Sequence, residues 1–328
     1  MLKKKHPVVS VIIPVYNTER FLERLILSLE KQTFKQFEII WVNDGSTDNS
    51  FRIIESHKAK DKRFVLLNQE NKGVSEARNL GLRHACGKYI MFADSDDFLH
   101  SRCIELAVDA IRKSQADICQ FSYKYIGLND EVVDKNYKNL PKLYCVKNPL
   151  NMYLDKKMKK SGLVWDKIYK EDIARCVSFR KVQPGEDDLY SFEIMFKAKK
   201  VSFLDAQLYY HTRNPMSIMH LTTDNKYYNN SLMVANEFYD IVKIYTKNNK
   251  INKRIQEKLK IYYAEKFLFK IYISKPIRNK MKNIDMEKNI KFVYEQLQKN
   301  NFNIKWRFKL VLFFLRKGYN RCARILLG

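Results

Sequence analysis

The first third of the chain repeats one pattern, an apolar run followed by a polar turn and then by a helical segment. The apolar runs and the helical patterns between them cover 8–13, 21–29, 37–42, 49–59, 64–67, 75–85 and 88–92. A spacing of about 25 residues between apolar runs is typical of βα units, whose strands pair in parallel. The sequence therefore predicts an α/β fold with a sheet flanked by helices.

The fourth apolar run leads into a cluster of acids, Asp94, Asp96 and Asp97. Ligands of open α/β sheets bind at the carboxyl ends of strands, where these side chains are expected. Carboxylates at positions i and i+2 can share one Mg²⁺ or Mn²⁺ ion with the oxygens of a diphosphate. The alternative is that Ser95 or Asp96 caps a helix running on to residue 111. The cluster alone leaves both interpretations open.

Composition narrows the class of protein. Sixty-one Lys and Arg against 36 Asp and Glu give a formal charge of +25, which favours nucleic acid, anionic lipid or phosphorylated substrates as partners. The six cysteines include no C-x-x-C pair, so we expect reduced thiols in a cytoplasmic protein rather than a zinc site. We expect no export signal, and the longest apolar run, 310–315, is far shorter than the roughly 20 residues of a membrane span.

Turn-rich and basic stretches divide the rest of the chain. After a helix and a strand ending near residue 122, a connection rich in Lys and Asn leads to a middle module, and from about residue 224 the pattern is helical and basic. The predicted parts are 1–122, 123–222 and 223–328. Near the end, 306–317 is an apolar segment between basic flanks, either in contact with a membrane or docked onto the body of the protein.

A series of segments resembles, in order, the motifs of bacterial family 2 glycosyltransferases. They are Val11–Asn17, Asn43–Asp48, the G-x-x-x-A-R-N stretch within Asn71–Asn79, the D-x-D of Asp94-Ser95-Asp96, and Gly185-Glu186-Asp187. Each is weak alone, but their order is specific, and the match covers roughly the first two thirds of the chain. The resemblance implies the GT-A fold, a mixed nucleotide-sugar-binding sheet flanked by helices, here with a helical C-terminal extension.

By this resemblance the enzyme is an inverting hexosyltransferase. It moves a hexose or N-acetylhexosamine from a UDP-sugar to a hydroxyl of a glycan or lipid-linked glycan acceptor, in the synthesis of a bacterial surface polysaccharide such as lipooligosaccharide or capsule. The basic C-terminal region is expected to contact an anionic membrane, which places the protein in the cytoplasm at the inner face of the cell membrane.

The resemblance also implies which residues bind the donor. Asp44 and Asp94 suit the uracil imide or a ribose hydroxyl, Tyr16 suits the base, and Arg78 suits a phosphate. The simpler, purely structural alternatives are that Asp44 only holds a turn, Tyr16 only packs and Arg78 is a solvated helix residue. The full predicted set is Pro14, Val15, Tyr16, Asn17, Glu19, Asp44, Gly45, Ser46, Lys72, Gly73, Ala77, Arg78, Asp94, Ser95, Arg213 and Ser217.

The resemblance also implies a metal ion and a general base for the transfer reaction. Asp96 is the first choice as ligand of Mn²⁺ or Mg²⁺, with Asp94 and His211 as further ligands; the alternative for His211 is a packed side chain. Asp187 is the expected general base, flanked by Glu186. These acids equally fit the first turn of a helix over 189–198, and both roles can hold together.

Trp165, Lys167 and Asp188 are the expected acceptor-binding residues, although most buried tryptophans are simply core. Two other functions are alternatives to glycosyl transfer. A nucleotidyltransferase acting on sugar phosphates would carry a glycine-rich basic first turn, where this chain has Pro14-Val15-Tyr16-Asn17. A nucleic-acid-binding protein would fit the charge, but no binding module is recognisable, and we expect no nucleic-acid partner.

Overall fold

The computed structural model describes residues 6–214 apart from 129, 131, 140, 151–161, 183 and 184, together with scattered residues between 233 and 259. The chain divides into two compact units, Met1–Ser217 and Ile218–Gly328. Ser217, the apolar segment 306–317 and most of the predicted basic helices lie outside the described residues. The three-part division at residues 122 and 222 stays a prediction.

The predicted βα units are present at the start of the first unit. Their strands pair in parallel in the order β3-β2-β1-β4, with Val15 opposite Asn43 and Ile12 opposite Phe92, so their carboxyl ends lie at one edge of the sheet. The strand β1 is buried along its whole length, as its β-branched residues predict. The four strands are β1 (Val9–Val15), β2 (Phe37–Asp44), β3 (Phe64–Gln69) and β4 (Tyr89–Phe92).

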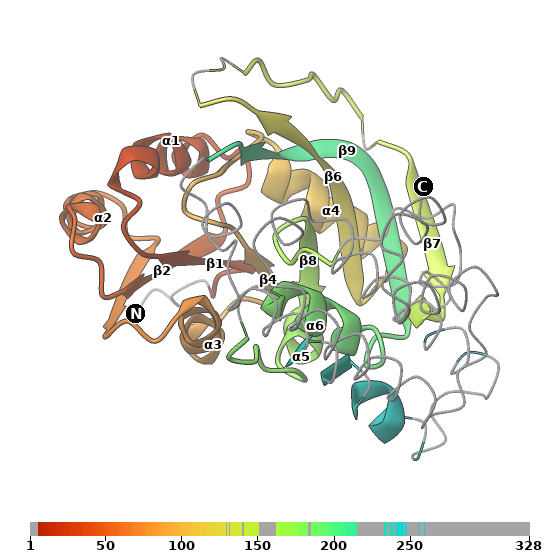
Figure 1. Ribbon diagram of the computed structural model, residues 1–328. Coiled ribbons are helices and arrows are strands. Elements are labelled where there is room, and N and C mark those ends of the chain that lie inside the picture. Colours follow the sequence, from red (N-terminus) through yellow and green to blue (C-terminus); the bar gives the residue numbers. More distant parts are fainter. Residues whose placement is uncertain are drawn as a thin grey trace, which may run out of the picture. The chain divides into compact units, whose positions relative to one another are not determined.

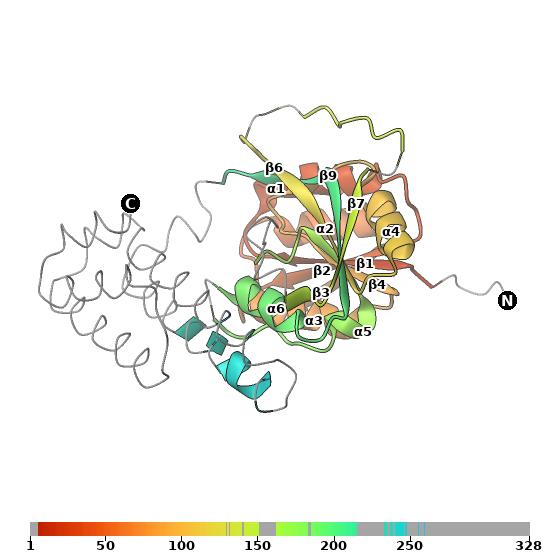
Figure 2. The same cartoon turned by 90° about the vertical axis from the view of Figure 1, so that its right-hand side faces the viewer.

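Helices cover both faces of the sheet (Figures 1 and 2). Apolar residues of α1 (Glu19–Glu30), α2 (Ser50–Lys58) and α4 (Cys103–Ser114) belong to the core on one face. On the other face, α3 (Val74–His84) packs close to β1, because a Cβ added at Gly81 would lie 2.4 Å from the Ile12 side chain. This close approach brings the side chains of α3 to the sheet.

The later strands make the sheet mixed. The strand β8 lies antiparallel between β4 and β6, β9 runs parallel to β6, and β5 and β7 pair antiparallel with β9. The sheet with flanking helices is the predicted architecture. The bounds are β5 (Phe98–Leu99), β6 (Ile118–Ile126), β7 (Leu143–Lys147), β8 (Lys167–Lys170), β9 (Lys200–Thr212), α5 (Glu171–Ala174) and α6 (Glu186–Ile194).

The structure decides against one interpretation of the acidic cluster. Neither Ser95 nor Asp96 caps a helix, because the chain continues from the cluster into β5, and α4 begins only at Cys103 after Arg102. The residues between β4 and β5, 93–97, form the acidic loop. Its path is set by the pairing of β5 with Tyr209 and Tyr210 of β9. Among the described residues, no helix combines the length and apolar character that crossing a membrane requires.

Candidate active site

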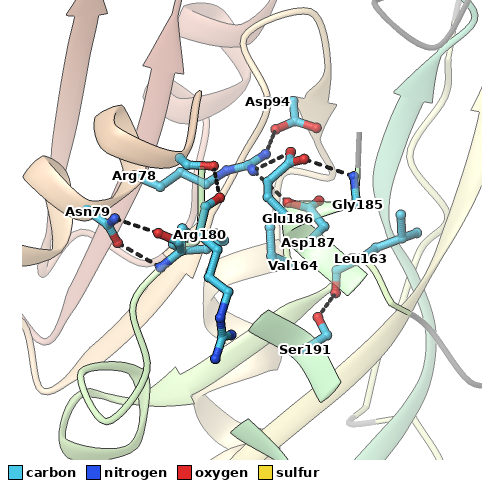
Figure 3. A network of polar contacts seen from close by, with 12 residues as sticks. Arg78, Asn79, Asp94, Leu163, Val164, Arg180, Gly185, Glu186, Asp187 and Ser191 are labelled. Atoms are coloured by element: carbon cyan, nitrogen blue, oxygen red, sulfur yellow. Dashed lines mark hydrogen bonds and ion pairs between the residues drawn. The ribbon is translucent and has the colours of Figure 1, made fainter. Parts of the chain in front are cut away.

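Two acidic segments far apart in the sequence meet at one guanidinium (Figure 3). Asp94 follows the end of β4, and Glu186 and Asp187 open α6. Between them, Arg78 of α3 donates from Nη2 to Asp94 Oδ1 at 2.9 Å, and from Nη1 to Asp187 Oδ1 at 2.5 Å and Glu186 Oε1 at 3.2 Å. The D-x-D loop and the segment of the expected base therefore meet at one side chain.

Arg78 is buried, so the alternative that it is a solvated helix residue is wrong. Its side chain is 3% exposed, and its guanidinium lies 5.3 Å from the centre of the Phe179 ring. Burial lowers its pKa, but the charges of Asp187, Asp94 and Glu186 outweigh burial, so the pKa is raised and Arg78 stays protonated. Among the described residues no acceptor lies within hydrogen-bonding distance of its buried Nε.

Asp187 lies in a site with more negative than positive charge. Burial raises the pKa of Asp187 well above its ordinary value, Arg78 opposes this, and the carboxylates of Glu186, Asp94 and Asp188 add to it. Its position in the first turn of α6 is also the predicted acidic helix start. The predicted helix start is confirmed, whereas the role of Asp187 as base stays a prediction; a carboxylate with a raised pKa is a stronger proton acceptor.

Asp97, which the sequence analysis did not select, organises the acidic loop. Its fully buried carboxylate accepts hydrogen bonds from the Tyr209 hydroxyl at 2.8 Å and the Thr212 backbone N–H at 2.8 Å, and lies 3.0 Å from His211 Nδ1. Burial raises the pKa of Asp97 to about 7. The Tyr209 hydroxyl also accepts from the Asp94 backbone N–H at 3.0 Å, so Asp97 ties the loop to β9.

Asp96 belongs to the acidic loop, and its charge interacts with that of His211 on β9. Burial, followed by the charge of Asp94, raises the pKa of Asp96, whose Oδ2 accepts from Asn214 Nδ2 at 3.0 Å. Burial lowers the pKa of His211, but its hydrogen bond and charge interaction with Asp97 outweigh burial and raise it. Within the described part of the chain, no three His, Cys, Asp or Glu residues form a group spaced to hold a metal ion.

The predicted donor turns contact one another at the carboxyl edge of the sheet. Asn17 Oδ1 accepts from the Thr47 backbone N–H at 2.8 Å, and the Asn17 N–H donates to Ser46 Oγ at 3.2 Å. Glu19 Oε2 accepts from the Asn49 backbone N–H at 2.8 Å. Tyr16 is 46% exposed, so it is accessible at this edge of the sheet.

Asp44 holds a turn, as the simpler alternative predicted, but this turn lies around Lys72 and Gly73 rather than next to Asp44. Its carboxylate accepts from the backbone N–H groups of Lys72 at 2.8 Å and Gly73 at 2.9 Å, and from Gln69 Nε2 at 2.7 Å. Gly45 has φ +70°, and a Cβ there would lie 2.8 Å from the Asn71 backbone nitrogen. Only glycine fits this approach of the two turns without strain.

Several predicted donor residues do not present their side chains to solvent. Ser95 is 6% exposed, so its hydroxyl is nearly buried. Pro14, Val15 and Ala77 are buried, so their side chains are not accessible either. Arg213 follows the end of β9, and its guanidinium is 6.0 Å from the centre of the Tyr125 ring.

The acceptor prediction needs correction at two residues. Trp165 is 3% exposed and stacks on Tyr209 at 4.4 Å and His211 at 5.1 Å, so its indole is core rather than an open sugar platform. Lys167 is fully buried and pairs with Asp166. Its ammonium is therefore out of reach of an acceptor, whereas Asp188 is only half-buried.

Tyr125 is the accessible aromatic residue that sequence reasoning missed. It is 52% exposed, and its ring meets that of His211 edge-on at 5.3 Å. Alternation along β6 puts Tyr123 on the same face, and that residue contacts Trp165. A row of aromatic rings thus leads from the core to the surface beside the acidic loop.

Residues 10–180 match the family described as Glycosyl transferase family 2. The chain belongs to this family. Glycosyltransferase GlyA of Streptococcus pneumoniae is 34% identical over 213 residues, which cover 61% of this chain and 30% of GlyA. The putative glycosyltransferase EpsH of Bacillus subtilis is 32% identical over 222 residues, which cover 65% of this chain and 63% of EpsH. The match thus spans less than two thirds of these relatives' length.

A solved structure confirms the predicted GT-A type of fold. The crystal structure of S. aureus TarS 1–349 in complex with UDP-GlcNAc superposes with a TM-score of 0.71 at 20% identity. The superposition covers 97% of this chain and 90% of that one. The family prediction made from the ordered motifs is confirmed as well.

Proposed function

We propose that this family 2 glycosyltransferase moves a hexose or N-acetylhexosamine from a UDP-sugar to a hydroxyl of a glycan acceptor, with inversion at the anomeric carbon. The observation that carries the proposal is the meeting of Asp94 and Asp187 at the guanidinium of Arg78. The proposed donor-binding loop and the proposed base thereby contact the same guanidinium. The UDP-GlcNAc complex of TarS supports the choice of donor.

In this proposal Asp187 accepts the proton of the acceptor hydroxyl. The acceptor oxygen forms a bond to the anomeric carbon while the bond from that carbon to the diphosphate oxygen breaks, and UDP leaves with the electron pair. A free alcohol is a weak acid, so proton transfer must accompany bond formation. The raised pKa of Asp187, caused by burial and by its acidic neighbours, makes it a better acceptor for that proton.

The carboxylates of the acidic loop are ligands of the type that Mn²⁺ and Mg²⁺ prefer, and Mg²⁺ is commonly held by one or two carboxylates together with substrate phosphates. Asp96 and Asp94 supply carboxylate oxygens, and burial together with the charge of Asp94 disfavours an uncompensated Asp96 carboxylate. Because Nδ1 of His211 faces Asp97, its Nε2 is left to face away from that residue. Asp96 would hold the ion first, with Asp94 and His211 as further ligands. Such an ion supplies charge neutralisation for a leaving diphosphate.

The proposed setting is the synthesis of a bacterial surface polysaccharide, lipooligosaccharide or capsule. The acceptor is then a glycan or a lipid-linked glycan, and the chain works in the cytoplasm at the inner face of the cell membrane. A net charge of +25 supports attraction to anionic lipid. Liposomes containing anionic lipid should therefore retain the protein at low salt and release it at high salt, whereas neutral vesicles should not retain it.

A screen of UDP-hexoses and UDP-N-acetylhexosamines for release of UDP tests the proposal. We expect release that depends on Mn²⁺ or Mg²⁺ and increases with a suitable glycan acceptor. Release of pyrophosphate from a nucleoside triphosphate and sugar phosphate would instead indicate a nucleotidyltransferase. Salt-sensitive binding to nucleic acid, with no UDP release from any donor, would also contradict the proposal.

A further inference from the structure

Arg78 is placed to hold the candidate base rather than a phosphate. Both of its terminal nitrogens are used within the protein, Nη1 by Asp187 and Glu186 and Nη2 by Asp94. With a side chain only 3% exposed, it would have to give up carboxylates that are 11–27% exposed before it could bind a phosphate. Leaving buried charges without a partner is costly, so this exchange is unfavourable.

The surroundings of Arg78 fix its guanidinium in place. Its helix packs closely on β1 at Gly81, and the ring of Phe179 lies over the guanidinium. The next residue, Asn79, fixes the Phe179 backbone through two hydrogen bonds, each 2.9 Å long (Figure 3). A planar fork held in this way imposes the direction of the carboxylates that it binds.

The same fork sets the distance between the two acidic segments. Asp94 and Asp187 come from different elements, and the guanidinium is the bridge that links their side chains directly. Three carboxylates around one cation would otherwise repel one another, so the charge of Arg78 favours the approach of the Asp187 side chain to Asp94. A displacement of about 1 Å at a reacting group can cost about 100-fold in rate.

We propose that Arg78 is a positioning residue, which orients the base Asp187 and ties it to Asp94 across the site, and does not grip the donor phosphate. This inference rests on the proposed function, because it assigns a partner to the base of that reaction. It replaces the phosphate-binding role expected for Arg78 from the sequence. Its consequence is that Arg78 acts on the rate of transfer and not on donor affinity.

The test is Arg78→Lys in the full chain, which keeps the positive charge but loses the fork. Turnover is measured as UDP release from the best donor of the screen, and affinity by calorimetry with UDP. We expect kcat to fall about 100-fold while KM for the donor and Kd for UDP stay within about threefold. Arg63→Lys is the matched control, because Arg63 also makes a forked ion pair, with Asp61, at the start of β3.

A phosphate ligand would behave differently. If Arg78→Lys weakens UDP binding about tenfold or more while kcat stays near the parent value, the inference is wrong, and it is equally wrong if neither quantity changes. Should the variant fail to fold, Arg78→Lys combined with Glu186→Gln relieves the crowding of carboxylates and carries the same comparison, against Glu186→Gln alone. A parent protein that neither binds UDP nor releases it would reject the proposed function itself.

Discussion

Replacing Lys167 by methionine tests whether this residue is core or part of an acceptor site. The Lys167 ammonium donates to the Leu163 carbonyl and lies 2.5 Å from Asp166 Oδ1, and both charged side chains are fully buried. The variant retains most of the side-chain volume but removes the cation. The Asp166 carboxylate then keeps the amide of Gln120, at 3.2 Å, but loses the charge of Lys167.

The expected cost is that of breaking a buried ion pair from one side, about 3–5 kcal/mol. For a unit of this size, 1 kcal/mol corresponds to a change of roughly 2–4 °C in Tm, so Lys167→Met should lower Tm by about 10 °C. Thermal unfolding followed by circular dichroism measures this. The paired variant Asp166→Asn with Lys167→Met removes both charges and should recover most of the loss.

The opposite pattern would refute the reasoning. If Lys167→Met leaves Tm unchanged but raises KM for the acceptor, then Lys167 reaches the acceptor, and the buried pair does not describe its role. A paired variant no more stable than the single one would also show that the uncompensated charge is not what destabilises the protein.

Three further outcomes follow from the site. Because burial raises the pKa of Asp187, its proton-accepting form is lost as pH falls through that raised value, and kcat/KM should decline at a pH above the ordinary aspartate range; a decline only near pH 4 would contradict this. Tyr125→Ala should raise KM for the acceptor about two- to tenfold with donor KM unchanged, and Tyr144→Ala, equally an exposed tyrosine, should not; equal effects would remove Tyr125 from the acceptor site. Asp97→Asn should weaken Mn²⁺ binding, measured by electron paramagnetic resonance, about 10- to 100-fold, because a neutral amide replaces the carboxylate that orients His211 and raises its basicity; unchanged affinity would exclude this role.

The core of the sheet was predictable because local sequence decides it. The β-branched run of β1 and the polar turn after β2 define strands and loops without any long-range information. The assignment of Asp94 and Asp187 to one site rested only on the order of the motifs. Nothing within either segment shows that they meet at Arg78.

The errors come from contacts that only the folded chain contains. Trp165 and Lys167 are polar or amphipathic by type, but pairing of β8 inside the sheet and stacking on Tyr209 bury them. Asp97 was missed because its partners lie more than a hundred positions away on β9. The alternative of a helix cap at Ser95 or Asp96 stayed open in the sequence because β5 is too short to give a strand pattern.

The most direct test of the account is a crystal structure of the Asp187→Asn variant with Mn²⁺ and UDP-GlcNAc. We expect the uracil near Tyr16 and Asp44, the diphosphate beside Asp96, and the anomeric carbon between the diphosphate and residue 187. A nucleotide bound elsewhere, or a sugar whose anomeric carbon faces away from residue 187, would contradict the claim that these two acidic segments flank one activated sugar.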